Sequence, residues 1–224
     1  MMGGDLKQQS SREVDGSRRT PARAARQSDT RRRLVEGFTK AVAEQGYART
    51  DVEDVIARAG LSRSDFDSHF EGLDQCLLAA HDAFFERLWK VTVEACAAQG
   101  EDWRCRLRAG LSAALDFLVD VPGLARVFVV EVVATGPAGI ERRQAALARF
   151  AELLRGGRSR LGGDPLPDLT EQFLVAGVAS VVEERLLMEE AELLPSLRDE
   201  LADLLLAPYM GRDEPSHTAR AQRV

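Results

Sequence analysis

Hydrophobic positions along the chain recur with the period of an α-helix and show no sustained alternation of the kind found in β-strands. Between Leu34 and Val42 the apolar residues follow a spacing of i, i+1, i+4, i+7 and i+8, which places one stripe on a helix that ends at Gly46. Later stripes, separated by breaks such as Gly136-Pro137 and Gly156-Gly157, predict further helices. These helices are expected over residues 73–98, 103–121, 124–135, 140–155, 169–190 and 195–209. We therefore expect an all-α protein.

Two short helices joined by a tight turn follow the first helix. A capping box predicts that the second helix starts after Thr50, a turn at Gly60-Leu61 ends it, and Ser62 caps the third helix. Residues 29–72 thus have the pattern of a helix-turn-helix domain. A three-helix bundle that serves only as a packing module has a similar pattern, although the capping boxes and the turn spacing favour the DNA-binding form.

Charge is unevenly distributed along the sequence, whose net charge is −6. Residues 1–33 carry nine basic and four acidic side chains, whereas residues 34–80 carry four basic and nine acidic ones. Residues 1–28 and 211–224 lack a hydrophobic period, so we expect a disordered basic arm and a disordered tail. A basic arm beside an acidic body indicates an anionic partner, unless the arm is a solvated, non-specific tail.

Composition argues against several other classes of protein. No apolar run is long enough to cross a bilayer, and the N-terminal segment lacks the apolar core of a secretory signal, so we expect a cytoplasmic protein with no membrane partner. The three cysteines and three histidines are scattered and indicate neither a disulfide framework nor a metal site. The sequence has no phosphate-binding glycine loop and no pairing of a base with a nucleophile. We therefore expect no enzymatic activity, no cofactor and no metal.

The motifs of residues 32–80 resemble the DNA-binding head of the TetR family of transcriptional regulators. The matching positions are Gly46-Tyr47, Thr50, Ile56-Ala57, Ala59-Gly60-Leu61-Ser62 and His69-Phe70. A less specific resemblance continues through Val130-Glu131, Gly136-Pro137 and Pro208-Tyr209-Met210-Gly211. The resemblance implies a homodimer whose subunits each carry a helix-turn-helix head and a helical domain, residues 73–210, for effector binding and dimerisation. It also implies a repressor that binds a near-palindromic double-stranded DNA operator and responds to a small-molecule effector.

Four positions depart from the family pattern in ways that concern DNA. The usual Gly-Thr pair of the third helix is Ser64-Asp65, a phosphate-binding Tyr is Asp67, and a phosphate-binding Lys is Leu73. These changes should weaken binding to the DNA backbone. In the interpretation that we favour, arginines of the arm and the first helix compensate, as homeodomain arms do in the minor groove. In the alternative, the head no longer binds DNA and the protein is a protein-binding or small-molecule-binding module.

On the favoured interpretation, the DNA contacts lie on the third helix and near the starts of the first two. The candidates are Arg31, Arg32, Arg33, Thr50, Ser62, Arg63, Ser64, Asp65, Ser68 and His69. Arg63 would donate hydrogen bonds to guanine O6 and N7, and Asp65 would accept one from a cytosine amine. Thr50 and the adjoining start of the second helix would bind a phosphate. A solvent-facing role for Arg63, and capping roles for Asp65 and His69, explain the same residues nearly as well.

The segment from Phe173 to Val182 is apolar all round and contains several small residues, so we expect it to be buried on every side. Together with the last helix it would form half of a four-helix dimer interface, as the resemblance implies, while part of it belongs to the core of one subunit. The candidate interface residues are Phe173, Ala176, Gly177, Ser180, Leu197, Leu201, Leu204 and Leu205.

An effector pocket is harder to locate, because most of the candidate residues also suit a plain core. The candidates are Phe84, Phe85, Leu88, Trp89, Phe117, Phe128, Glu131 and Val132. Glu131 lies in an apolar run and needs a partner, which is either an arginine or a polar group of the ligand. The candidate arginines are Arg104, Arg106, Arg108 and Arg126. A cavity with such a lining would take an apolar, aromatic or acyl, small molecule.

Overall fold

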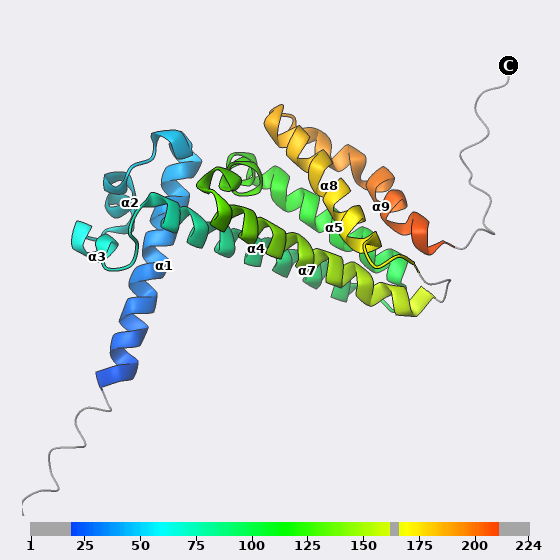
Figure 1. Cartoon of the computed structure of the whole chain (residues 1–224), viewed down its shortest axis with the longest axis horizontal. Coiled ribbons are helices and arrows are strands. Elements are labelled where there is room, and N and C mark those ends of the chain that lie inside the picture. The colour runs from blue at the N-terminus through cyan, green and yellow to red at the C-terminus, as the bar shows by residue number, and fades with distance from the viewer. Residues whose placement is uncertain (1–18, 162–165, 211–224) are drawn as a thin grey trace, which may run out of the picture. The chain divides into compact units, whose positions relative to one another are not determined.

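The computed structural model describes residues 19–161 and 166–210, and every regular element in those two ranges is a helix (Figure 1). The all-α prediction is therefore confirmed for the described part of the chain. The chain divides into two compact units, residues 1–76 and 77–224. The boundary between them falls inside α4 (Leu73–Ala98), a few residues after the expected boundary at residue 72.

The first unit contains the predicted three-helix head. Its helices are α1 (Arg19–Gln45), the short 3-10 helix η1 (Tyr47–Arg49), α2 (Val52–Ala59) and α3 (Arg63–Asp67). α2 packs against both α1 and α3. Gly60 adopts a left-handed conformation with φ 63°, which a glycine tolerates at no steric cost, and its amide donates to the carbonyl oxygens of Ile56 and Ala57. This turn redirects the chain from α2 into α3, as the sequence predicted.

Apolar side chains from all three helices meet inside the head. Leu34 and Phe38 of α1, Val55 of α2 and Phe66 of α3 are almost completely buried. The Phe66 ring lies 5.6 Å from the ring of Phe70, a usual distance for a pair of aromatic side chains. Burial of these side chains fixes which face of α3 points outward.

Two expectations for the head are wrong. α1 begins at Arg19, so residues 19–28 are helical rather than disordered, while residues 1–18 lie outside the described part. The cap of α2 is Asp51 rather than Thr50, and it forms a reciprocal capping box with Asp54. An aspartate one residue further on therefore takes the role that the Thr50 pattern suggested, because its carboxylate accepts from the N3 amide.

The second unit is a bundle built from the remainder of α4 and the later helices. These are α5 (Trp103–Asp120), α6 (Pro122–Ala125), the π-helix η2 (Arg126–Val130), the 3-10 helix η3 (Glu131–Thr135), α7 (Pro137–Leu161), α8 (Thr170–Leu187), the 3-10 helix η4 (Ala191–Leu197), α9 (Arg198–Leu206) and the 3-10 helix η5 (Ala207–Tyr209). α5 packs against α7 and α9, and α8 packs against α7 and α9 (Figure 1). The predicted tail, residues 211–224, lies outside the described part.

Two predicted elements of this unit differ from the structure. Residues 124–135 were expected to form one regular helix but pass from α6 through a π-helix into a 3-10 helix. The predicted break at Gly156-Gly157 is absent, because α7 continues without interruption to Leu161. Both differences show that tertiary packing overrides local propensity at these positions.

Candidate DNA-binding surface and ligand cavity

The outward face of α3 carries the side chains that the sequence assigned to DNA bases. Arg63, Ser64 and Ser68 are exposed, whereas Phe66 points into the head and is buried. The Ser68 hydroxyl donates to the carbonyl of Asp65 at 2.8 Å, which leaves Arg63 and Ser64 as the more accessible polar groups. The face is therefore accessible to a partner, but it is also acidic.

Arg63 is held by two carboxylates of the head itself. Its Nε donates to Oδ1 of Asp67 and its Nη1 to Oε1 of Glu53, both at 3.0 Å. The hydrogen bond with Asp67 and the nearby carboxylates raise the pKa of the guanidinium above its ordinary value. All three side chains are more than half exposed, so solvent screens these ion pairs and a base edge can compete for the arginine.

Ser62 and Asp65 serve the local structure of α3. The Ser62 hydroxyl accepts from the Asp65 amide, while the Asp65 carboxylate accepts from the Ser62 hydroxyl at 2.6 Å and the Ser62 amide at 2.8 Å. These hydrogen bonds from Ser62 lower the pKa of Asp65. The carboxylate is thus engaged in a capping box and is not directed at a cytosine.

The expected phosphate site at the start of α2 is also satisfied internally. Thr50 is only 6% exposed and donates from its hydroxyl to the carbonyl of Gly46 at 2.9 Å. The Asp51 carboxylate accepts from the Asp54 amide at 2.9 Å, so a carboxylate already occupies this helix N-terminus. A phosphate would have to displace it.

The three consecutive arginines of α1 have different partners. Arg33 donates from Nη2 to the carbonyls of Ala59 and Gly60 at 2.8 and 3.1 Å, which ties α1 to the end of α2. The Arg31 guanidinium lies over the ring of Phe70. Arg32 forms surface ion pairs on its own helix. His69 is half-buried, and its electrostatic interaction with Asp65 contributes to the lowered pKa of that carboxylate.

The basic charge of the N-terminal region lies on α1. Residues 19–33 contain six arginines and one aspartate, whereas residues 1–18 contain three basic and three acidic residues. Arg23 and Arg26 are exposed on this helix, and neither forms an ion pair with another of the described residues. The cations are therefore presented by a helix and not by the segment before it.

An apolar cavity of about 170 Å³ lies inside the second unit. Its wall is formed by α4, α5, α7, α8 and α9 together with one residue of η2. The lining residues are Phe85, Leu88, Thr92, Cys96, Trp103, Leu107, Gly110, Leu111, Ala114, Leu115, Leu118, Val129, Arg143, Leu147, Phe150, Leu153, Leu154, Val175, Val178, Ala179, Val182, Glu183 and Leu205. Such a mostly apolar wall with a few polar groups is typical of a small-molecule site.

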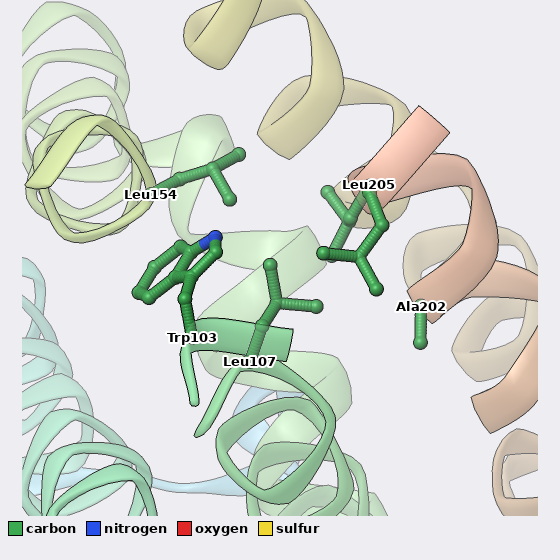
Figure 2. Close-up of a cluster of buried hydrophobic side chains, with 6 residues drawn as sticks. Trp103, Leu107, Leu154, Ala202 and Leu205 are labelled. Atoms are coloured by element: carbon green, nitrogen blue, oxygen red, sulfur yellow. The ribbon is translucent and has the colours of Figure 1, made fainter. Parts of the chain in front are cut away.

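The indole of Trp103 forms part of the cavity wall. Trp103, which is 7% exposed, packs with Leu107, Leu154 and Leu205 in a cluster that Figure 2 shows. α7 passes so close to the ring that a Cβ atom at Gly157 would lie 1.9 Å from Cε2 of Trp103. The glycine that suggested a helix break is therefore needed for this contact.

The polar groups of the wall have distinct states. Arg143 and Glu183 form an ion pair across the wall, with Nε donating to Oε1 at 3.0 Å. The Thr92 hydroxyl donates to the carbonyl of Leu88, and burial raises the pKa of the Cys96 thiol, which keeps it neutral. In contrast, Nε1 of Trp103 is buried and has no hydrogen-bond partner among the described residues.

Of the predicted pocket residues, only Phe85 and Leu88 line the cavity. The remaining candidates have other positions: Phe84, Phe117 and Phe128 form an aromatic cluster, Trp89 packs on Phe150, Val132 is fully buried, and Glu131 pairs with Arg126 at 3.3 Å. Of the two partners expected for Glu131, an arginine or a polar group of the ligand, the structure thus shows the arginine. The sequence reasoning missed the α5 wall, which the i, i+4, i+8 spacing of Trp103, Leu107 and Leu111 could have indicated.

The predicted dimer residues fall into two groups. On α8, Phe173, Ala176, Gly177 and Ser180 are exposed, so the expectation that this segment is buried on every side does not hold within one subunit. Leu204 of α9 is also exposed, and Leu197 is half-buried. In contrast, Leu201 and Leu205 are buried, because that face of α9 packs against α5 and α8. These two leucines belong to the subunit core.

Within residues 19–161 and 166–210, no helix is long and apolar enough to span a membrane. Within the same residues, no group of three or more His, Cys, Asp or Glu side chains could hold a metal ion.

The arrangement of a three-helix head followed by a helical bundle is the fold of the TetR-family transcriptional regulators. FadR of Bacillus halodurans, a fatty acid degradation regulator, is 19% identical and superposes with a TM-score of 0.62, covering 78% of this chain and 96% of that one. FadR of Bacillus subtilis, solved with stearoyl-CoA, is 16% identical with a TM-score of 0.65, covering 78% and 97%. A TetR-family regulator of Marinobacter aquaeolei is 20% identical with a TM-score of 0.57, covering 81% and 97%. No protein-family model matches the sequence, and no curated protein matches it significantly.

Proposed function

We propose that this protein is a DNA-binding transcriptional regulator that acts as a homodimer and responds to a small apolar effector. One observation carries the proposal: a helix-turn-helix head with an outward-facing α3 is followed, in the same chain, by a helical unit that encloses an apolar cavity. The shared fold with transcriptional regulators supports it. The first unit would bind the operator, and the second would bind the effector.

On this proposal, α1 supplies much of the positive charge that attracts DNA. The face of α3 is surrounded by carboxylates, so affinity for phosphates has to come from elsewhere. The exposed Arg23 and Arg26 are the best placed, since neither is paired with a carboxylate of the described residues. Arg63 would exchange Asp67 and Glu53 for a guanine edge when the head enters the major groove.

The DNA-binding step is tested by mobility shifts on the DNA that flanks the gene, at several salt concentrations. Replacing Arg23 and Arg26 by Ala should weaken binding and reduce the salt slope by about two for each subunit. The matched control is deletion of residues 1–18, which carry no net charge and should leave the slope nearly unchanged. Asp67→Asn should strengthen binding, because it releases Arg63 and removes a carboxylate near the phosphates.

The alternative function is a DNA-free binding module, and the ion pairs of Arg63 favour it. The two functions differ in the same assay. If the wild-type protein binds none of the DNA fragments at low salt, and Asp67→Asn does not bind them either, the regulator proposal fails and the DNA-free binding module is supported.

The homodimer is proposed from an uncovered face of α8. Leu169 and Phe173 are 69% and 80% exposed, and Leu187 lies further along the same helix with half of its surface exposed. Between them, the small residues Ala176 and Gly177 would permit close approach of another helix. Exposed apolar patches of this kind mark interaction sites. If the same face of α8 in a second copy packs against it, the contact is self-complementary and two-fold symmetric.

Sedimentation analysis of the purified protein tests this interface. Gly177→Glu should convert the dimer into a folded monomer, because a Cβ at Gly177 meets nothing within 4 Å in the subunit. Gly156→Glu is the matched control, since it adds the same charge at an equally open helical position of α7 and should leave the dimer intact. A dimer that persists in Gly177→Glu would place the interface elsewhere.

The cavity is the proposed effector site. One of the structures that share the fold was solved with stearoyl-CoA, and the wall of this cavity is likewise suited to an apolar group. An effector bound there would alter operator affinity only by binding the DNA-competent and DNA-free states differently. The measurement is the mobility shift repeated in the presence of each compound that raises the melting temperature of the protein.

A further inference from the structure

The size and wall chemistry of the cavity restrict what it can bind. Its volume of about 170 Å³ is close to the roughly 150 Å³ of an engineered apolar cavity that holds benzene. The volume therefore suits a compact molecule such as a single ring.

The charged groups of the wall already neutralise each other. Arg143 and Glu183 share the hydrogen bonds of one ion pair, and the side chains of both are about three-quarters buried. A ligand carboxylate would have to displace Glu183 from Arg143 and leave that carboxylate without its partner, which is costly in a mostly apolar wall. The cavity thus offers no spare cation for an anionic ligand.

Nε1 of Trp103 is a buried donor in the wall that lacks a hydrogen-bond partner among the described residues. The Trp103 side chain is buried, with only 7% of its surface exposed, and its Nε1 has no acceptor among the residues that the structure describes. Figure 2 shows this nitrogen on the edge of the ring that faces the side chains of Leu154, Leu107 and Leu205, all of which line the cavity. Apolar side chains cannot accept the hydrogen bond, and an unmet buried donor costs free energy.

We propose that the effector is a compact, uncharged, mostly apolar molecule with one hydrogen-bond acceptor, such as a carbonyl oxygen, that accepts from Nε1 of Trp103. This inference rests on the proposed function only in taking the cavity as the effector site. The Trp103 ring would both bind the ligand and select for its acceptor, while the Arg143–Glu183 pair would exclude acids.

Nuclear magnetic resonance of the 15N-labelled full chain tests the proposal without DNA. The protein has two tryptophans, so two indole N–H signals are expected, and Trp103→Phe identifies the one from Trp103. The probes are cyclohexanone, methylenecyclohexane, which has the same shape without an acceptor, and cyclohexanecarboxylate. Cyclohexanone should move the Trp103 signal downfield, methylenecyclohexane should bind without that downfield shift, and the carboxylate should bind at least tenfold more weakly than cyclohexanone.

Affinities give an independent readout. In Trp103→Phe, the affinity for cyclohexanone relative to methylenecyclohexane should fall by about 2- to 12-fold, the range expected for one hydrogen bond. The proposal would be overturned if both neutral probes bind with no downfield shift, or if the carboxylate binds preferentially. Either result would still be consistent with the cavity as the effector site. Binding of neither neutral probe would overturn both the inference and the effector role of the cavity. Loss of DNA binding alone would contradict only the proposed function.

Discussion

The two neighbouring glycines of α7 provide a sharp test of how the second unit is packed. A Cβ atom at Gly157 would lie 1.9 Å from Cε2 and 2.2 Å from Cζ2 of Trp103, whereas a Cβ at Gly156 meets nothing within 4 Å. Carbon atoms in contact normally lie about 3.5–4.0 Å apart, so Gly157→Ala must push the buried indole by more than about 1 Å. Gly156→Ala changes the same helix without any such contact.

The expected free energies follow from these two environments. Replacing a helical glycine by alanine stabilises by about 1 kcal/mol, which applies in full to Gly156→Ala. Gly157→Ala gains the same term but adds an overpacking cost of about 1–3 kcal/mol. The free energy of unfolding of Gly157→Ala should therefore be about 1–3 kcal/mol lower than that of Gly156→Ala. Urea denaturation followed by circular dichroism measures both, and equal values for the two variants would refute the close contact between α7 and the indole.

Three further predictions concern the head and the last helix. Ser62→Ala removes the cap of α3 and should destabilise the head by about 0.5–2 kcal/mol in urea denaturation. Ser62 lowers the pKa of Asp65 below its ordinary value of 3.8, so this carboxylate stabilises the head fully above that pH and loses its effect as the pH falls through the lowered pKa. Ser62→Ala should therefore make the stability of the head less dependent on acid pH, and an unchanged pH dependence would contradict this argument. Arg33→Met keeps the aliphatic stem but removes the hydrogen bonds to the end of α2, so the urea midpoint of the head should fall, whereas an unaltered midpoint would assign the arginine no structural role. Leu205→Ala should cost about 2–5 kcal/mol of unfolding free energy, while the exposed Leu204→Ala should cost little and act only on dimer dissociation; similar losses would argue against the core position of Leu205.

The sequence predicted well the parts of the fold that depend on local patterns. The turn at Gly60 and the capping box of Ser62 and Asp65 are properties of a few adjacent residues, and both are confirmed. The orientation of Phe66 likewise follows from helical period alone. Each of these features can be read from the sequence because the physical cause lies within one or two helical turns.

The cavity was predicted poorly because its wall is assembled from five helices that are distant in sequence. Periodicity shows that Phe128 and Val132 are buried, but it cannot distinguish a core position from a cavity wall. Trp103 lines the cavity because α7 approaches it at Gly157, a contact between residues 54 positions apart that no local pattern records. Arg63 illustrates the same limit on the surface, since its partner Glu53 belongs to a different helix.

The placement of the basic residues on α1 affects how binding to a polyanion is expected to proceed. Side chains on a flexible tail must be ordered during association, and the lost conformational freedom subtracts from affinity. Arg23 and Arg26 are one turn apart on a helix that is already formed, so about 4.5 Å of rise along a common axis separates them before any partner arrives. On the proposed function, the two side chains would therefore meet a strand of phosphates from a helix that is already formed, and association should be limited by diffusion and charge attraction more than by folding of the segment.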